Sequence, residues 1–523
     1  MTTAVEETRV LAADSNQARG IAEYAIDFLR HDAGQPDDVV LEKTRQFFTD
    51  SVLCGLSAIA LGTNAPNVLR EEALLYPRPF EQGGATLFGN NAPVAAEKAI
   101  VANCAAVREW DSNGTNFGYN AALGHTAGEF GHNDFYAVPL AAAQHAGLSG
   151  ADVLRGMVCH DEIRGRLAEV FSLKSYKIDH VVHGAIASAA VYGAMLGATA
   201  EQIESAIGMT VAHYIPWRAI RAGKQLSDSK GASAALSTEV AVLAMQRSMR
   251  GFLGPRDIFR NPEAIFRQFE PTSGDASPFE LHLRLAGDDF AVMGMHFKLG
   301  LYEHQSAGAI QGVIDLIRQH PHLLESPDRI ASIRIVAYEP AFGIIGDPAK
   351  RNPTTRQSAD HSMVYIISTL LRKALEHHAA GRAEELTASN ESCWKALMLA
   401  PQDYAADAIH DPTTRALMDR IEFAHGGEDY DRRYPDGIPT SLTITDDRGN
   451  TCDSGLVMYP VGHARNTTAD LEDVLDAKFR LLGQLAAGDG DAITKRYRDI
   501  ADLDADQVRR LNDYTLRDGG TFE

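Results

Sequence analysis

Cysteine is scarce in this chain and never occurs in a close pair. A disulfide framework, a zinc ribbon and a closely spaced iron–sulfur motif all need paired cysteines, and the sequence has no C-x-x-C. A reducing compartment suits such a chain, so we expect a cytoplasmic protein. The five cysteines are Cys54, Cys104, Cys159, Cys393 and Cys452.

Basic residues are also in short supply. The 523-residue chain has 49 Lys and Arg against 70 Asp and Glu, a formal net charge of -21. Such a surface repels phosphate backbones and anionic lipids, so we expect no nucleic-acid partner and no membrane surface. An anionic ligand would have to bind in a local basic pocket.

Long apolar runs and the common catalytic motifs are missing as well. The N-terminus lacks the basic and apolar regions of a signal peptide, and the most apolar stretch, 184–198, is short and rich in Ala and Gly. It predicts a buried helix. The sequence has no H-E-x-x-H, no G-x-S-x-G and no dinucleotide fingerprint, so we expect no metal site.

Helical periodicity dominates the first 280 residues. We expect helices from about residue 15, over 36–62 and over 94–110. Ser149 and Thr199 each open a capping box, which predicts two further helices. No alternation long enough for a useful strand occurs before about residue 280.

The pattern then changes to that of a second, α+β domain of roughly 170 residues. Residues 329–338 alternate as a half-buried strand, 420–424 add another, and 441–459 form a hairpin around a glycine-bearing turn. Asp360 is the expected cap of a helix over 361–372. After Pro460 the chain turns helical again, and from Gly488 onward it is polar and expected to be peripheral.

The stretch 108–136 carries a carboxylate, a hydroxyl and an imidazole in a turn-rich segment between two helices. These are Asp111, Thr115 and His132. One interpretation is structural: Asp111 and Thr115 cap a helix, and His132 lies on the surface. The other is a catalytic site, since loops on a rigid scaffold often carry catalytic groups.

Four further segments bring lysine, arginine and histidine together. Capping or a solvated turn is the alternative interpretation for the first two, while burial would shift the pKa values of Lys298 and its neighbouring histidines in the third. The combination favours general acid–base chemistry on an anionic substrate whose carboxylates are held by basic side chains. The segments are 177–184, 221–231, 295–305 and 459–465.

In their joint order these segments resemble the MmgE/PrpD family, which includes 2-methylcitrate dehydratase, cis-aconitate decarboxylase and an iminodisuccinate epimerase. The similarity covers nearly the whole chain. The last two segments resemble the 2-methylcitrate dehydratase branch most. The matching segments are Ala85–Gly89, Asp111 to His132, Glu162–Arg166, Asp179–Ile186, Leu226–Gly231, Phe297–Lys298, Asp360–Tyr365 and Tyr459–Arg465.

The resemblance implies a mainly α fold, in which both chain ends build an all-helical domain and an α+β lid is inserted. The expected boundaries are 1–290 and 463–523 for the helical domain and 291–462 for the lid, with the active site in the cleft between them. It also implies a homodimer that needs no cofactor and acts on a small polycarboxylate.

The resemblance further implies the site residues. The active-site positions fall on Asp111, Thr115, His132, Lys298 and a lysine of the 224–230 loop. Lys224 corresponds better to the decarboxylase lysine, and Lys230 matches the dehydratase pattern, so both are candidates, with Lys224 slightly favoured. The expected substrate-binding residues are Lys230, Arg166, His183, His304 and Arg465.

Two departures from the family pattern leave the substrate open. The first departure is the motif that begins at Asp111, which has three residues between Asp111 and Thr115. The second is an insertion of about eight residues between Thr115 and His132, a length that loops tolerate. We expect a lyase that dehydrates a 2-methylcitrate-like tricarboxylate to a cis-aconitate-type product. The alternatives are a decarboxylase or epimerase of a related acid, and a non-catalytic dimeric homologue.

Overall fold

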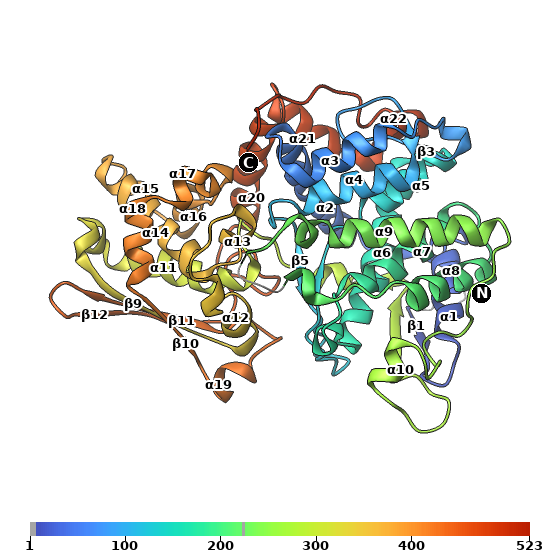
Figure 1. Cartoon of the computed structure of the whole chain (residues 1–523), viewed down its shortest axis with the longest axis horizontal. Coiled ribbons are helices and arrows are strands. Elements are labelled where there is room, and N and C mark those ends of the chain that lie inside the picture. Colours follow the sequence, from blue (N-terminus) through green and yellow to red (C-terminus); the bar gives the residue numbers. More distant parts are fainter. Residues whose placement is uncertain (1–6, 222–224, 523) are drawn as a thin grey trace.

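The computed structural model describes residues 7–221 and 225–522, and most of them are helical. The N-terminal half supplies the helical mass on the right of Figure 1. Its principal helices are α1 (Gln17–Arg30), α2 (Asp38–Ala60), α3 (Asn64–Leu74), α4 (Ala96–Arg108), α5 (Ala137–Ala146), α6 (Gly150–Val170), α7 (Val181–Met195), α8 (Ala200–His213), α9 (Asp228–Met249) and the short α10 (Ile265–Phe269).

The predicted helix starts are confirmed by their caps. The Asn16 side chain accepts a hydrogen bond from the amide of Arg19 at the start of α1. Ser149 and Thr199 each accept a bond from the N3 amide of α6 and α8, and the N3 side chain returns one. These reciprocal bonds satisfy amides that a helix leaves without internal partners.

Helix α7 is the centre of the helical part. All of its residues are buried, and it packs against α6, α8 and α9. Its glycines and alanines let neighbouring side chains approach its backbone closely: a Cβ on Gly184 would lie 2.0 Å from the Phe135 ring. The predicted buried helix is therefore confirmed.

A four-stranded sheet forms the core of the second part, on the left of Figure 1. The strand order is β10-β9-β11-β12, with β10 parallel to β9 and the other pairs antiparallel. Helix α11 (Ala307–Gln319) packs on β11 and β12. The strands are β9 (Ile330–Ala337), β10 (Ile421–His425), β11 (Thr440–Asp446) and β12 (Thr451–Val457), so the predicted strands and hairpin are confirmed.

Most helices of this part lie on one side of the sheet in Figure 1. The cap predicted for one of them was wrong. Ser362, not Asp360, is the N-cap of α14, since its hydroxyl accepts a bond from the amide of Tyr365. The Asp360 carboxylate instead contacts Lys230 and His361. The helices are α12 (Glu339–Ile344), α13 (Arg356–Ala359), α14 (Met363–Ala379), α15 (Ala383–Thr387), α16 (Asn390–Leu397), α17 (Ala406–Ile409), α18 (Pro412–Asp419) and α19 (Glu428–Asp431).

The C-terminal helices return to the N-terminal ones, as the red and blue ribbons in Figure 1 show. Helices α20 (Leu471–Ala486) and α21 (Gly490–Arg498) pack on α2, and α22 (Ala505–Arg509) packs on α5. The expectation that residues after Gly488 are peripheral was wrong. Tyr497 and Asn512 are fully buried, and the Asn512 amide donates to Thr86.

Short strand pairs complete the fold, and one of them carries candidate site residues. Strands β5 (Thr115–Phe117) and β6 (Phe130–His132) pair antiparallel, with Thr115 opposite His132. Three residues are too few for an alternating pattern to be visible in the sequence. The other pairs are β1 (Thr8–Leu11) with β7 (Leu281–Arg284), β2 (Gln35–Pro36) with β8 (Ala286–Gly287) and β3 (Gly84–Ala85) with β4 (Val94–Ala95).

No single helix in the described ranges combines the length and hydropathy of a membrane span. Only α2 and α3 taken together reach that length and hydropathy, and they are bent by 87° where they join.

We predict that Gly184→Val destabilises the protein. The new side chain would collide with the Phe135 ring in a closely packed core, which costs about 1–3 kcal/mol of unfolding free energy or more. Urea unfolding followed by circular dichroism measures the change. Gly488→Val is the matched control, because a Cβ there meets nothing within 4 Å, and equal midpoints for both variants would contradict the packing argument.

Candidate active site

Asp111 is the centre of a buried cluster of charged side chains. Its carboxylate accepts a hydrogen bond from Arg108 and lies 2.5 Å from the ammonium of Lys298. Its second oxygen lies 3.6 Å from Lys230 Nζ and 3.2 Å from His361 Nε2. Three cationic groups therefore face one carboxylate.

The surroundings keep Asp111 ionised. Burial alone would raise the pKa of this carboxyl, but the charges of Arg108, Lys298 and Lys230 outweigh it and hold the pKa well below its usual range. The residue has a left-handed backbone, with φ 50°, a conformation that Asp and Asn tolerate better than most residues. Asp111 therefore follows α4 in a tight turn that directs its side chain into the cluster.

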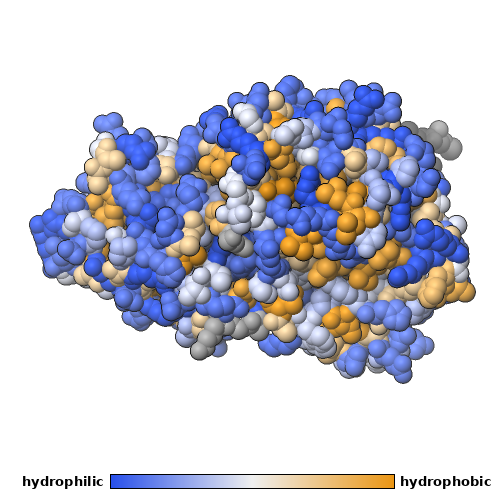
Figure 2. All heavy atoms as spheres, turned by 45° about the horizontal axis from the view of Figure 1, so that its top comes forward, coloured by the Kyte–Doolittle hydropathy of each residue, from blue (hydrophilic) through white to orange (hydrophobic). Residues whose placement is uncertain are grey.

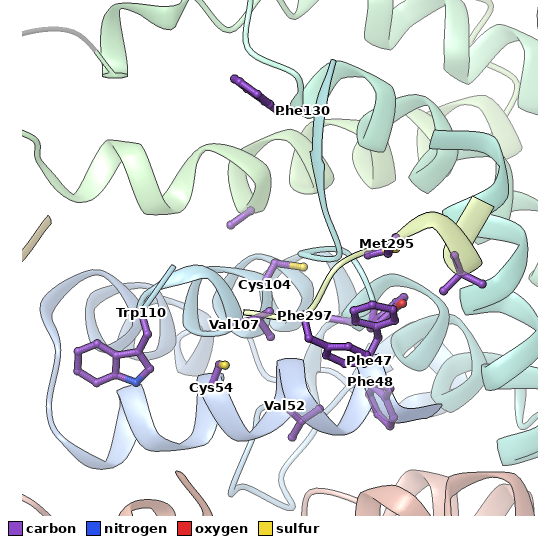
Figure 3. Packing of buried hydrophobic residues seen from close by; sticks show 14 of the residues in the cluster. Phe47, Phe48, Val52, Cys54, Cys104, Val107, Trp110, Phe130, Met295 and Phe297 are labelled. Carbon is purple, nitrogen blue, oxygen red and sulfur yellow. The ribbon is translucent and has the colours of Figure 1, made fainter. Parts of the chain in front are cut away.

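Elements far apart in the sequence deliver these side chains. Arg108 ends α4, and Lys230 lies in the first turn of α9. Lys298 follows Phe297, whose ring stacks on Phe47 of α2 with 3.9 Å between ring centroids. Figure 3 shows this pair within the core between α2 and α4. Since neighbouring side chains of an extended segment point to opposite sides, burial of Phe297 directs Lys298 to the site.

The two lysines have different carboxylate partners. Lys298 Nζ bonds the side chain of Asp111 and also its backbone oxygen, at 2.9 Å. Burial lowers the pKa of Lys298, and the charge of Asp111 counteracts part of that effect. Lys230 Nζ lies 3.1 Å from Asp360 Oδ1.

His361 bridges the two carboxylates. Its Nδ1 lies 2.6 Å from Asp360, and its Nε2 faces Asp111. Burial first, and then the charge of Lys230, lower the pKa of His361 to about 3, so the imidazole is neutral near pH 7. The motif containing Asp360 and His361 was recognised in the sequence, but neither residue was predicted to lie in the site.

Thr115 and His132 lie side by side on β5 and β6. The Thr115 hydroxyl donates to the carbonyl of Gly131 at 2.8 Å, and its backbone exchanges two bonds with His296. The His132 ring faces Arg108, with nitrogen–nitrogen distances of 3.3 and 3.4 Å. Burial and then Arg108 hold the pKa of His132 well below its usual value, so the imidazole is neutral near pH 7.

A second histidine, His180, lies beside His132. The residue predicted from the sequence was His183. His180 is buried with its ring centroid 5.0 Å from that of His132, and neither of its nitrogens has a hydrogen-bond partner. His183 lies one helical turn further on, where its Nε2 is 3.1 Å from the carbonyl of Phe171. The structure thus brings His180 to the site and directs His183 to the backbone.

His304 lies in a stack of three histidines. Its ring is parallel to that of His296 at 5.3 Å, and His296 stacks on His463 at 4.0 Å. Neither nitrogen of His304 has a hydrogen-bond partner. Burial, and then the charge of Lys298, keep the pKa of His304 well below its usual value, so the neutral ring offers one donor and one acceptor nitrogen to a ligand.

Arg166 and Arg465 lie further away, beside a cavity of about 270 Å³ that His296 also lines. Arg166 is already bonded to Glu162 and Glu169. Arg465 is paired with Asp436. Both guanidinium groups are neutralised within the protein, so this cavity is less basic than the cluster around Asp111.

Glu303 is a site neighbour that the sequence interpretation did not select. Its amide donates to the carbonyl of Asp360 at 2.9 Å, and its carboxylate accepts a bond from the amide of Gln305 at 2.8 Å. Burial, and then the charge of Asp111, raise the pKa of Glu303 to about 7. This carboxyl therefore titrates in the physiological range.

Two sequence predictions about the site remain, one for Lys224 and one for the absence of a metal. Lys224 lies outside the described residues 7–221 and 225–522, so only Lys230 of the two candidate lysines is placed in the cluster. Ligand atoms of Asp111, Asp360 and His361 lie within 4.8 Å of one another and could in principle hold a cation. Because Lys298 and Lys230 already neutralise these carboxylates, the predicted absence of a metal stays our expectation.

Comparison with known proteins identifies two matching family descriptions. The MmgE/PrpD N-terminal domain matches residues 19–275. The MmgE/PrpD C-terminal domain matches residues 302–390 and 398–499. Together the matches cover most of the chain, including every residue of the cluster except Lys298.

The similar curated proteins are dehydratases by name. A mitochondrial 2-methylcitrate dehydratase of Yarrowia lipolytica is 26% identical over 493 residues, covering 91% of this chain and 87% of the relative. A 2-methylcitrate dehydratase of Cupriavidus necator is 25% identical, covering 84% and 85%. An alkylcitrate dehydratase of a fungal species is 24% identical, covering 98% and 97%.

We predict that Asp111→Asn lowers the unfolding free energy by about 3–5 kcal/mol. The change keeps the left-handed backbone accessible but leaves Arg108, Lys298 and Lys230 buried without their common counter-charge. Urea unfolding measures the loss. Asp436→Asn is the control. It removes the half-exposed partner of Arg465 and should lower the unfolding free energy by at most about 1 kcal/mol. Similar losses in the two variants would disprove the central role of Asp111.

Proposed function

The chain belongs to the MmgE/PrpD family, and on this premise we propose that it is a hydro-lyase that dehydrates a 2-methylcitrate-like tricarboxylate. The observation that carries the proposal is the cluster around Asp111, where buried ammonium groups lie next to neutral imidazoles. Ammonium groups bind carboxylates and donate protons, and neutral imidazoles accept protons. A dehydration of a polycarboxylate needs both.

In the proposed reaction His132 is the base and Lys298 the acid. The neutral His132 removes a proton from the carbon next to a carboxylate, and the electrons of that bond form the new double bond. The carbon–oxygen bond of the substrate breaks, and the hydroxyl leaves as water with a proton from the Lys298 ammonium. Solvent then returns the proton from His132 to Lys298.

The remaining cluster residues position these two groups. Asp111 holds the Lys298 ammonium through two bonds and favours its protonated state. Thr115 fixes β5 against β6 and so the place of His132. Lys230, together with the ring nitrogens of His304 and the Nε2 of His180, supplies donors and acceptors for the substrate carboxylates and hydroxyl; His180 Nδ1 lies 3.5 Å from Asp179. This division of roles needs no cofactor, and we propose that none is used.

Dehydration is favoured over the alternatives that the sequence left open. Decarboxylation and epimerisation would use the same basic site and would also need an acid to protonate the carbanion, but neither expels a hydroxyl. The similar curated proteins reported above are named as dehydratases. A non-catalytic role would not require the neutral base and the ammonium acid to be adjacent.

We further propose a homodimer that acts in the cytoplasm, with the α+β part as a lid over the site. Large apolar side chains are exposed on the helical part, among them Trp217, Phe252 and Leu253. Figure 2 shows several apolar patches on that side of the molecule. Contiguous exposed apolar surface commonly marks a contact between subunits.

We predict that His132→Gln lowers kcat for 2-methylcitrate or citrate by about 10²–10⁴-fold, the usual contribution of a general base. The ultraviolet absorbance of the conjugated product measures turnover. His183→Gln is the control, because His183 contacts a backbone carbonyl and should leave kcat within a few-fold. Unchanged turnover in the His132 variant, or carbon dioxide release from cis-aconitate by the wild-type protein, would overturn the assignment.

We also predict a pH dependence that originates at Glu303. Its carboxyl is protonated below its pKa of about 7 and adds negative charge beside an anion site above it. The KM for a tricarboxylate should therefore rise as the pH passes through about 7. Glu303→Gln lacks this titration, so the ratio of wild-type to variant KM should grow with pH at constant ionic strength.

The pH dependence of the unfolding free energy provides a second measurement of the ionisation of Glu303. A folded-state pKa near 7 lies above the ordinary value of 4.5, so the wild-type protein should lose stability relative to Glu303→Gln as the pH rises between about 4.5 and 7. If KM and the unfolding free energy change with pH in the same way in the wild type and in Glu303→Gln, this role of Glu303 is ruled out.

A further inference from the structure

Buried cations in this protein generally have carboxylate partners. Near the site, Lys230 is paired with Asp360 and Lys298 with Asp111. Elsewhere, Lys478 is 2.6 Å from the buried Asp50. Pairing is expected because a lone charge is costly to remove from water. A cation that lies beside the site, is at least partly withdrawn from water and has no carboxylate partner in the described chain therefore points to a counter-charge that arrives with a ligand.

Arg218 is one such cation. It lies in a short 3-10 turn, Arg218–Arg221, of the helical part. Its guanidinium lies 6.0 Å from the Phe130 ring, and its Nη1 is buried without a hydrogen-bond partner. Neighbouring Arg221, by contrast, is paired with Asp179 at 2.5 Å. Arg218 is thus a partly exposed residue whose buried Nη1 has no hydrogen-bond partner.

Lys350 is the other, and it comes from the α+β part. It ends a 3-10 turn, Pro348–Lys350, and only 6% of it is exposed. Its ammonium has neither a hydrogen bond nor an ion pair within the described residues. Burial lowers the pKa of Lys350 to about 8, although the charges of Glu303 and Asp347 counteract it. The charges of Lys230 and Arg218 act on this pKa in the same direction as burial, since all these groups lie near one another.

Hydrogen bonds join the segment that follows Arg218 to the segment that follows Lys350. Leu226 donates its amide to the hydroxyl of Ser358 at 2.9 Å, and the Gln225 side chain donates to the carbonyl of Asn352 at 3.3 Å. The ion pair between Lys230 and Asp360 lies along the same boundary. Arg218 and Lys350 therefore stand on opposite sides of the boundary between the helical and α+β parts, next to the catalytic cluster.

We propose that Arg218 and Lys350 together bind a substrate carboxylate remote from the reacting carbon, and so set a preference for tricarboxylates over dicarboxylates. This inference rests on the proposed function, because that function brings the anion to the site. Lys298 and Lys230 are already neutralised in part by Asp111 and Asp360, whereas neither Arg218 nor Lys350 forms an ion pair with a described residue. Glu303, whose charge acts on both, has a pKa of about 7 and is therefore partly neutral near that pH. An anion held from both sides also draws the two parts of the chain together.

Binding of an unreactive tricarboxylate tests the proposal without turnover. Propane-1,2,3-tricarboxylate lacks the leaving hydroxyl, and pentanedioate lacks the third carboxylate. By isothermal titration calorimetry, Arg218→Gln and Lys350→Met should each weaken binding of the tricarboxylate about 10- to 100-fold, the usual effect of losing a charge-assisted bond. Binding of pentanedioate should change by less than about threefold.

Matched variants separate this role from a general loss of structure. Lys43→Met removes another lysine whose pKa burial lowers to about 8, but that ammonium lies over the Phe297 ring, 4.7 Å from its centroid, and tricarboxylate binding should not change. Lys350→Arg keeps the charge and should bind within a few-fold of the wild type. Circular dichroism checks that each variant is folded.

The outcomes are distinguishable from failure of the proposed reaction. Selective loss of tricarboxylate binding in both variants supports the subsite even if no substrate is dehydrated. Equal affinity of the wild type and both variants for propane-1,2,3-tricarboxylate would overturn it, and so would an equal loss for the two ligands. Binding by the wild type without turnover of any hydroxytricarboxylate would instead overturn the hydro-lyase proposal.

Discussion

The arrangement of the site depends on one buried carboxylate. Asp111 joins Arg108 at the end of α4, Lys230 at the start of α9 and Lys298 between the two parts of the chain. Burying so many charges is costly, and only close pairing compensates for it. The elements that carry these residues are therefore constrained to meet at one point, and that point is where the proposed chemistry occurs.

Apolar packing determines where these charges meet. Phe297 stacks on Phe47 inside the core, and the backbone of His296 pairs with that of Thr115. These contacts fix the segment from which Lys298 reaches Asp111. The same dense surroundings exclude water from the nearby imidazoles, so His132 and His180 stay neutral and remain able to accept protons. Packing and acid–base properties thus have a common origin.

Local patterns predicted most of the secondary structure. Capping boxes at Ser149 and Thr199 and the alternation of 329–338 are interactions between near neighbours, which a sequence displays directly. The cap at Asp360 was mispredicted for a related reason. A carboxylate next to a helix start looks like a cap in the sequence, but Lys230, 130 residues away, binds this one instead. Long-range ion pairing overrode the local preference.

The helical and α+β regions, the acidic surface and the candidates Asp111, Thr115, His132 and Lys298 could all be read from the sequence, because each follows from composition, periodicity or motif order. Which basic groups surround Asp111, and which have no ion pair among the described residues, became known from the folded chain. It selected His180 rather than His183, and it gave Glu303 a pKa of about 7. Burial and charge at those positions are set by residues far away in the chain, and a linear pattern does not contain those distances.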